Sequence, residues 1–299
     1  MSYYICLDIG GTSIKYGLSD ETGHFFQKGI RATGLPKKGI PYLLAQITDI
    51  IQTYQKDYEV AGAALDTAGI VDAKTGVILM EARNFPGYTG TNLIELVQHT
   101  CHLPCTVEND VNAAGLGEYW LGAGQKAKSL VCITIGTGIG GCVILNGHLL
   151  HGVSGSAGEI GYMRIPGTED DLEASAAVPR LVKTVAEAKG VPAAELNGEK
   201  IFSWAKEGDT ASIRAIDLML QRLAAGIGNI CCLLNPELIL LGGGIMAQQD
   251  YLRPRLEVAL KKVLSPQLRG KTRIEFARLG NDAGMVGALR NFLNKSFTL

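Results

Sequence analysis

The sequence predicts an α/β protein built from two related halves. Two glycine-rich turns carry this prediction, because each joins two short apolar segments with the composition of buried strands. The first turn, residues 8–12, lies between residues 3–7 and 13–18, and the second, residues 135–141, lies between residues 130–134 and 142–145. Strand and helix patterns alternate along the rest of the chain, which is typical of an α/β fold with ligand-binding turns at strand ends.

In the first half, residues 25–32 have the pattern of a third strand, and apolar residues recur at helical spacing from residue 40 to residue 54. We expect a strand at residues 60–65, an amphipathic helix at residues 92–101 and a short strand at residues 105–108. The next helix, residues 111–121, carries small residues such as Ala113 and Gly117, so we expect it to pack closely against a neighbour.

The second half is largely helical after its opening hairpin. Residues 165–175 are acidic and polar and suggest a loop or an edge of the site, and the helical region of residues 176–234 ends in a long helix at 211–234. A strand at 238–241, a helix at 251–264, a strand at 273–277 and a helix at 282–293 complete the chain. The alternative, one Rossmann-like domain with a helical appendage, is disfavoured because neither turn has the G-x-G-x-x-G order followed by a helix.

Composition indicates a well-packed globular protein of 299 residues, with 46% hydrophobic and 19% charged residues. The formal net charge of −1 without a basic stripe argues against a nucleic-acid partner. The N-terminus lacks the pattern of a signal peptide, and no apolar run reaches the ~18 residues of a membrane span. Seven scattered cysteines suggest free thiols in a reducing compartment. We therefore expect a cytoplasmic protein that does not act at a membrane.

The two glycine turns point to phosphate chemistry. A turn that keeps side chains away from its bend exposes backbone N–H groups, which bind anions. Two such turns suggest a clamp on a polyphosphate and hence an enzyme that uses ATP. Asp8 precedes Gly10, Gly11 and Thr12, and a carboxylate beside a phosphate site fits a divalent cation bound directly or through water. The simpler alternative is that Asp8 caps the turn.

Two further segments carry candidate carboxylates. Asp110 follows a strand and precedes a helix, so it is either a general base at the end of a strand or, like Asn109, a helix N-cap. Phosphoryl transfer to an alcohol needs one such base. Glu159 lies in a glycine-rich stretch, residues 152–162. It suits hydrogen bonding to sugar hydroxyls, and its alternative is the start of a helix packed against the sheet.

In this order, the segments resemble the ROK family (repressors, uncharacterised reading frames and sugar kinases) of the superfamily that includes hexokinase, actin and Hsp70 chaperones. Residues 8–12 and 135–141 are similar to its two phosphate motifs, residues 240–245 to its adenosine motif, residues 108–114 to the segment with the catalytic Asp, and residues 84–88 to its sugar-side loop. The resemblance covers nearly the whole chain.

The resemblance implies a two-domain ribonuclease H-like (actin/hexokinase) fold with an interdomain cleft. The small N-terminal α/β domain would span residues 1–110, completed by the C-terminal helix at 283–299, and the large α/β domain with a helical insertion would span residues 111–282. The implied activity is ATP-dependent transfer of the γ-phosphoryl group to a sugar hydroxyl, expected at C6, by a homodimer.

The same resemblance assigns roles to individual residues. Asp110 would be the catalytic base, and the sugar contacts would be Asn84, Asn109, Glu159 and Glu173. Asp8 would face Mg²⁺, through water if not directly. The expected residues for ATP and Mg²⁺ are Asp8, Gly10, Gly11, Thr12, Lys15, Gly136, Thr137, Gly138, Gly140, Gly242, Gly243 and Gly244.

One departure from the family pattern concerns zinc. Many members bind a structural zinc through a cysteine cluster and a His three residues after the equivalent of Glu159. This chain has Tyr162 at that position and no cysteine between Met163 and Leu172. We therefore expect no zinc site, as in zinc-free members that resemble β-glucoside kinase and N-acetylmannosamine kinase. Whether Tyr162 contacts the sugar in place of the His stays open.

The acceptor also stays open among glucose, a β-glucoside and N-acetylmannosamine. Two alternatives to a sugar kinase are disfavoured. A non-catalytic sugar-sensing regulator of the same family would carry a helix-turn-helix before the first phosphate motif, where this sequence has only seven residues. A kinase for a small carboxylic acid is disfavoured because the expected site is rich in carboxylates, which would repel the acid.

Overall fold

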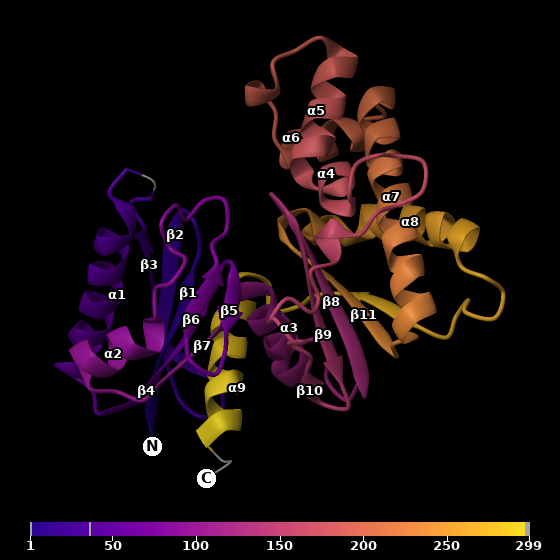
Figure 1. The fold of residues 1–299 in the computed structure, drawn as a ribbon. Coiled ribbons are helices and arrows are strands. Elements are labelled where there is room, and N and C mark those ends of the chain that lie inside the picture. The colour runs from indigo at the N-terminus through magenta and orange to yellow at the C-terminus, as the bar shows by residue number, and fades with distance from the viewer. Residues whose placement is uncertain (1, 36, 297–299) are drawn as a thin grey trace. The chain divides into compact units, whose positions relative to one another are not determined.

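The computed structural model of the chain describes residues 2–35 and 37–296. The chain forms two compact units, which are coloured by residue number in Figure 1. Unit 1 contains Met1–Lys126, Leu149–Ala157 and Asn281–Leu299, and unit 2 contains Ala127–His148 and Gly158–Gly280.

The sheet of unit 1 has five strands in the order β3-β2-β1-β4-β7. β1 (Tyr3–Ile9) and β2 (Ser13–Ser19) form the predicted hairpin, and β3 (Phe25–Ala32) pairs antiparallel with β2. β1, β4 (Val60–Thr67) and β7 (Cys105–Asn109) are parallel, so their carboxyl ends meet at one edge. A small hairpin of β5 (Ile70–Asp72) and β6 (Val77–Met80) was not expected from the sequence.

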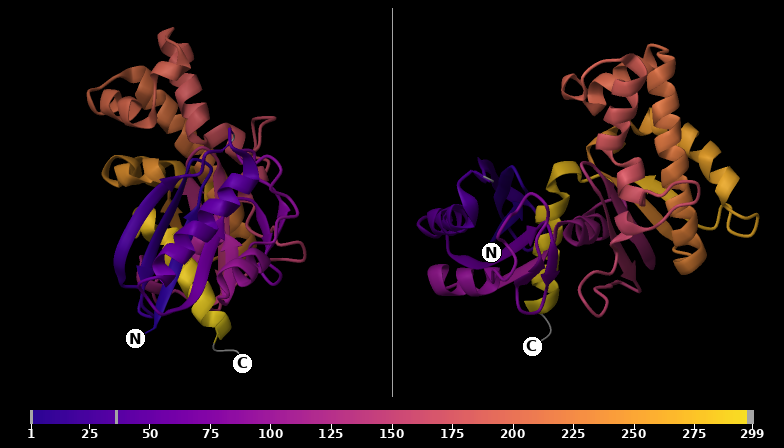
Figure 2. Two further views of the ribbon diagram at one scale, coloured as in Figure 1. Left: turned by 90° about the vertical axis from the view of Figure 1, so that its left-hand side faces the viewer. Right: turned by 45° about the horizontal axis from the view of Figure 1, so that its top comes forward.

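Helices cover both faces of this sheet (Figures 1 and 2). On one face, α1 (Gly39–Gln55) and α2 (Leu93–Cys101) share an apolar cluster with Ile5, Leu7 and Ile9 of β1. On the other face, α9 (Ala283–Ser296) packs against Cys6 of β1 and Ala64 of β4. This division follows from the alternation of side chains along a strand. α3 (Asp110–Leu121) packs along α9.

The contact between α3 and α9 is close enough to bring the two backbones together. A Cβ atom at Gly287 would lie 1.6 Å from the carbonyl oxygen of Ala113, and one at Gly117 would lie 2.4 Å from that of Ala283. The small residues of α3 therefore serve close packing, as the sequence predicted.

The sheet of unit 2 has the order β10-β9-β8-β11-β12. β8 (Ser129–Ile135) and β9 (Ile139–Leu145) form the second hairpin, and β8, β11 (Leu238–Gly242) and β12 (Arg273–Phe276) are parallel. β10 (His148–Leu149) is a short edge strand. The antiparallel hairpin followed by two parallel strands repeats the arrangement of unit 1, which confirms the internal duplication.

The helices of unit 2 share one apolar cluster with β8, β9 and β11. They are α4 (Leu172–Ala176), α5 (Val178–Lys189), α6 (Gly198–Lys206), α7 (Thr210–Leu234) and α8 (Gln249–Val263). The 3₁₀ segments of unit 2 are η1 (Ile160–Tyr162), η2 (Ala193–Glu195) and η3 (Gly244–Gln248), and η4 (Gly280–Asp282) spans the point where the chain passes from unit 2 to unit 1.

Two helices of unit 2, α4 and α7, bear on the predictions made from the sequence. The acidic segment predicted as a loop ends in the helix α4, because the Asp171 side chain accepts a hydrogen bond from the Ala174 N–H at 2.7 Å and so caps it. α7 is long and apolar enough to cross a membrane by length and composition alone. Most of that segment is buried within the unit, as in the central helix of a globular domain.

Candidate active site

Three carboxylates lie side by side at the carboxyl edge of the unit 1 sheet. Asp8 of β1 is paired in register with Asp66 of β4, and Asp66 is paired with Glu108 of β7. Side chains at paired positions project from the same face of a sheet. Lys15, opposite Asp8 on β2, donates to Asp8 Oδ2 at 2.8 Å. Sequence analysis missed Asp66, although it directly follows the predicted strand at 60–65.

Asp66 is the most unusual member of this row. It is fully buried, and within residues 2–35 and 37–296 neither of its carboxyl oxygens has a hydrogen-bond partner. Burial, and then the negative charges of Asp8 and Asp110, raise the pKa of Asp66 well above its usual range. The first turn of α9 lies against it, because a Cβ atom at Gly284 would be 3.0 Å from Asp66 Oδ2. The row therefore carries less negative charge than three ionised acids would.

The first glycine turn leaves backbone N–H groups open. Gly10 N donates to Ser13 O at 3.0 Å, while the carbonyl oxygens of Gly11 and Thr12 accept from the hydroxyl and the N–H of Thr33. The N–H groups of Gly11 and Thr12 have no acceptor among the described residues. Two free donors at a bend fit the expected anion site.

Asn84 lies against this first turn. A Cβ atom at Gly11 would be 3.0 Å from Cβ and 3.3 Å from Nδ2 of Asn84, so the glycine allows the close approach. The loop is anchored by Phe85 and Tyr88, which are buried and stacked with ring centroids 5.1 Å apart. The Tyr88 hydroxyl lies 3.2 Å from Thr67 Oγ1. Asn84 itself is exposed.

Asp110 is the first residue of α3. Its Oδ1 accepts from Val111 N at 2.9 Å and from Asn109 Nδ2 at 3.1 Å, and the helix N-terminus favours its negative charge. The proposed capping role of Asn109 is confirmed, because its Oδ1 accepts from the N–H groups of Val111 and Asn112. Asn109 Nδ2 also donates to Gly69 O at 2.9 Å.

Glu108 fixes the segment that carries Asp110. It is buried, its Oε1 accepts from Asn109 N at 3.0 Å and Asn112 Nδ2 at 3.1 Å, and its Oε2 lies 2.8 Å from His151 Nε2. The hydrogen bond to Glu108 is the main cause that raises the pKa of His151. His151 thus has a structural role in tying the segment 149–157 to the end of β7.

The second glycine turn has a comparable arrangement in unit 2. Gly136 N donates to Gly138 O at 2.9 Å, and Gly136 O accepts from Val178 N, at the start of α5, at 2.9 Å. Ile139 N donates to Glu173 Oε2 at 2.8 Å. In the part of the chain that the structure describes, the N–H groups of Thr137 and Gly138 have no acceptor.

A cavity of about 510 Å³ opens beside the second turn. This volume lies within the range of ordinary small-molecule sites, roughly 300–1,000 Å³. The cavity brings together three of the residues expected to bind ATP, Gly136, Thr137 and Gly244. Its lining also includes residues that sequence analysis did not single out, namely Val178, Asn197, Gly198, Glu199, Phe202, Ile245, Ala247 and Gln248.

The other glycines expected near ATP lie in the sheet of unit 2. Gly140 pairs with Thr134 within the second hairpin, and Gly242 is the last residue of β11. Gly243 has a φ of +99°, and a Cβ atom there would be 2.1 Å from Ile135 O. Only glycine permits this approach between the ends of β8 and β11.

Glu173 lies close enough to Glu159, the other expected sugar ligand of unit 2, to affect the pKa of Glu159. Partial burial, and then the charge of Glu173, raise the pKa of Glu159. Arg180 holds α4, which carries Glu173, by donating to Ala174 O at 2.7 Å and to the Asp170 carboxylate.

Arg222 of α7 also donates to Ser175 O, at 2.8 Å. These contacts hold residues 170–175 in place. Tyr162, which precedes this segment, is largely exposed.

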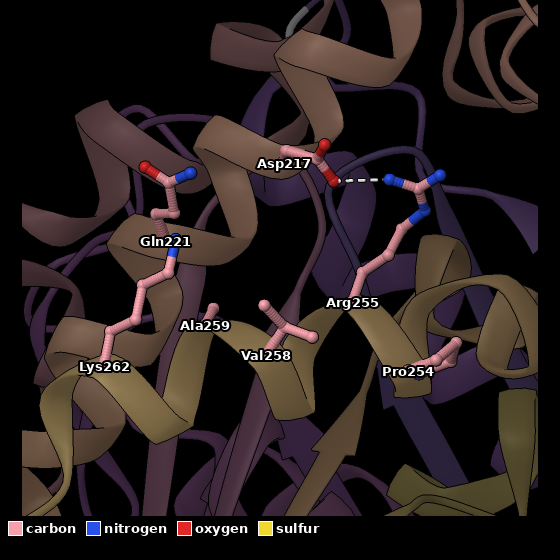
Figure 3. A pocket seen from close by; sticks show the side chains of 7 residues that line it. All are labelled: Asp217, Gln221, Pro254, Arg255, Val258, Ala259 and Lys262. Carbon is pink, nitrogen blue, oxygen red and sulfur yellow. Dashed lines mark hydrogen bonds and ion pairs between the residues drawn. The ribbon is translucent and has the colours of Figure 1, made fainter.

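A second cavity of unit 2, about 450 Å³, lies between α7 and α8 (Figure 3). The ion pair of Asp217 and Arg255, 2.7 Å apart, lies on one side of it, and Gln221 and Lys262 lie on the other. It contains none of the residues expected from the sequence, so the cavity beside the second turn is the better nucleotide site.

The acidic residues of unit 1 fit Mg²⁺, which prefers oxygen ligands and is usually held by one or two carboxylates together with substrate phosphates. Asp8 supplies such a carboxylate beside the first turn. The described residues contain no group of three His, Cys, Asp or Glu side chains that could hold a metal alone. Asp8 would hold Mg²⁺ directly or through water.

Comparisons with known proteins identify the family of the chain. The model of the ROK family matches residues 4–295. An uncharacterised protein of Clostridium perfringens is 41% identical over 98% of both chains, and a β-glucoside kinase of Listeria monocytogenes is 34% identical over 96% of both. The solved structure of a ROK family glucokinase from Streptomyces griseus, in complex with glucose and AMPPNP, has a TM-score of 0.83 at 27% identity and covers 97% of this chain and 98% of its own.

These findings confirm the expected two-domain α/β fold of the hexokinase and actin type, with two duplicated sheets. They also agree with ATP, accompanied by Mg²⁺, as the phosphoryl donor. The family match covers almost all of the sequence, and the relatives of known activity phosphorylate sugars. The chain is an ATP-dependent sugar kinase and belongs to the ROK family.

Proposed function

We propose that this kinase phosphorylates the C6 hydroxyl of a hexose or hexose derivative, such as glucose, a β-glucoside or N-acetylmannosamine, and that Asp110 is its catalytic base. The observation that carries the proposal is the placement of Asp110 at the start of α3. There its carboxylate follows the parallel strand β7 and is oriented by Val111 N and Asn109 Nδ2. The names of the relatives, which include glucokinase and β-glucoside kinase, support a hexose acceptor.

In the proposed mechanism, Asp110 accepts the proton of the C6 hydroxyl while the hydroxyl oxygen forms a bond to the γ-phosphorus. The bond from that phosphorus to the bridging oxygen of ATP breaks, and ADP leaves with the electron pair. Asp8 would hold Mg²⁺, directly or through water, and the bound ion would supply charge neutralisation to the phosphates. Lys15 and the free N–H groups of Gly11 and Thr12 would bind phosphate oxygens in unit 1. Such donors lower the barrier because they are oriented before the reaction.

Unit 2 would bind the remainder of the nucleotide. We assign the adenosine to the 510 Å³ cavity and the phosphates to the N–H groups of Thr137 and Gly138. Among the glycines, Gly136 and Gly244 would line this site. Gly10, Gly138, Gly140, Gly242 and Gly243 would act by allowing the turns and strand ends to adopt their shapes.

For the sugar, we propose hydrogen bonds to the four residues that the family resemblance implies, Asn84, Asn109, Glu159 and Glu173. Asn84 and both glutamates are exposed and can reach a ligand. Asn109 has its amide oxygen in the helix cap, so a sugar hydroxyl would have to replace Gly69 O as the acceptor of Nδ2.

An ADP-release assay over glucose, cellobiose, N-acetylmannosamine and acetate tests the proposal. Asp110→Asn should lower kcat on the preferred sugar by roughly 10²–10⁴, with an unchanged melting temperature. The control is Asp57→Asn, which alters an exposed aspartate of unit 1 and should act like wild type. Near-normal turnover of Asp110→Asn would refute its role as the base. Sugar binding without any turnover would favour the regulator, and activity with acetate alone would favour an acid kinase.

We also propose a cytoplasmic homodimer without a nucleic-acid partner, which follows from the family resemblance and the charge of −1. Light scattering coupled to gel filtration measures the mass of the particle. A monomer at micromolar concentration would contradict the dimer.

A further inference from the structure

The side chain of Glu173 occupies the second glycine turn. Its Oε2 accepts a hydrogen bond from Ile139 N at 2.8 Å, and a Cβ atom at Gly138 would be only 2.5 Å from the same oxygen. A side chain at position 138 would therefore displace the carboxylate that lies on it. A sugar-binding candidate thus contacts the turn that is expected to bind phosphate.

The contact is built into the surrounding backbone. A Cβ atom at Gly161 would be 2.3 Å from Ile139 O and 3.4 Å from Glu173 Cβ, so this glycine also admits the arrangement. Arg180 and Arg222 hold the two sides of α4 through Ala174 O and Ser175 O. Because α4 is fixed from both sides, Glu173 can leave Ile139 N only by rotating its own side chain.

A carboxylate in this place affects phosphate binding in two ways. It occupies Ile139 N, which lies next to the free N–H groups of Thr137 and Gly138. It also brings a negative charge to a turn whose other donors would bind phosphate, and like charges at a few ångströms repel. When the Glu173 carboxylate lies on the turn, it therefore weakens nucleotide binding in two ways, by occupying Ile139 N and by repelling the phosphates.

We propose that Glu173 couples the binding of sugar to the binding of nucleotide. Without sugar, its carboxylate lies on Ile139 N and weakens nucleotide binding. Sugar hydroxyls offer new donors, the side chain rotates toward them, and Ile139 N becomes available to a phosphate oxygen. The inference rests on the proposed function, because it uses the assignment of Glu173 to the sugar and of the turn to phosphate.

Calorimetric titration of AMPPNP with Mg²⁺ tests this coupling. It is carried out with and without whichever of glucose, cellobiose or N-acetylmannosamine the wild-type enzyme phosphorylates. In the wild type, sugar should tighten nucleotide binding by about 5- to 150-fold, the usual range for coupled sites. In Glu173→Ala, nucleotide should bind more tightly than in wild type when sugar is absent, and sugar should change the nucleotide Kd by less than about twofold.

Two further variants complete the experiment. Glu173→Gln removes the charge but keeps the shape, so it should also bind nucleotide more tightly than wild type without sugar, even if the alanine variant does not fold. Glu169→Gln changes an exposed glutamate in the same segment and should behave as wild type. Equal coupling in wild type and both Glu173 variants, or weaker sugar-free nucleotide binding in them, would overturn the inference. A wild type that phosphorylates no sugar would instead refute the proposed function, while the sugar-free comparison would still test whether Glu173 obstructs the turn.

Discussion

Replacing Gly287 with alanine should both destabilise unit 1 and impair catalysis. The added Cβ would lie 1.6 Å from Ala113 O and 2.8 Å from Gly117 N, both backbone atoms of α3 that cannot rotate away. Non-bonded atoms prefer separations of roughly 3.5 Å, so α3 and α9 must move apart by more than 1 Å. Overpacking of this kind costs about 1–3 kcal/mol and occasionally more.

The functional effect follows from the position of Asp110 at the first turn of α3. Misplacement of a reacting group by about 1 Å can lower the rate by roughly 10²-fold. Calorimetry and the ADP-release assay measure the two effects. At about 2–4 °C for each kcal/mol, the value for proteins of roughly 150–250 residues, a cost of about 1–3 kcal/mol should lower the melting temperature by roughly 2–12 °C.

The same substitution at Gly228 is the matched control. Gly228 lies inside α7, where the nearest atom to an added Cβ is a Val263 methyl group at 3.5 Å, an ordinary contact distance. Gly228→Ala should therefore stabilise the protein by up to about 1 kcal/mol, because alanine favours the helix. The packing argument would be refuted if Gly287→Ala melted like wild type, or if both variants lost stability equally.

Three other changes test individual contacts. Asp66→Asn should raise the melting temperature at pH 7 and leave it unchanged near pH 4. Because the pKa of Asp66 is raised in the folded protein, the wild type loses stability as the pH rises above the pKa of an unfolded Asp, whereas the variant with the neutral amide does not. A difference in melting temperature between the two proteins that stayed constant with pH would contradict this prediction. The wild type should lose stability as the pH rises from about 6.5, because a His with a raised pKa stabilises the fold in its protonated form. His151→Gln should abolish this loss, and a variant whose melting temperature followed the wild-type pH profile would contradict the prediction. Arg180→Met should raise the KM for sugar more than it lowers kcat, because α4, which carries Glu173, then loses one of its two anchoring arginines. A normal KM would show that Arg222 alone is enough to hold α4 in place.

Much of the fold was accessible from the sequence because it depends on local patterns. The two glycine-turn hairpins, the later strands of each sheet and the long helix α7 follow from apolar periodicity and from glycine at the bends. The hairpin of β5 and β6 was missed because its strands are only three and four residues long. The last residues of the acidic segment form α4 because Asp171 caps them, which composition alone did not indicate.

For the site, sequence by itself determined which residue types were present: two glycine turns, a carboxylate after β7 and the replacement of the usual His by Tyr162. The contacts between these residues depend on the three-dimensional fold. The register of β1, β4 and β7 placed Asp66 beside Asp8, and packing of α4 brought Glu173 onto Ile139 N, 34 residues away in sequence. Such pairings depend on strand register and on packing between distant segments. They cannot be predicted from the residues that flank a side chain in the sequence. Hence the turns and Glu173 were visible in the sequence, whereas the contact between Glu173 and the second turn was not.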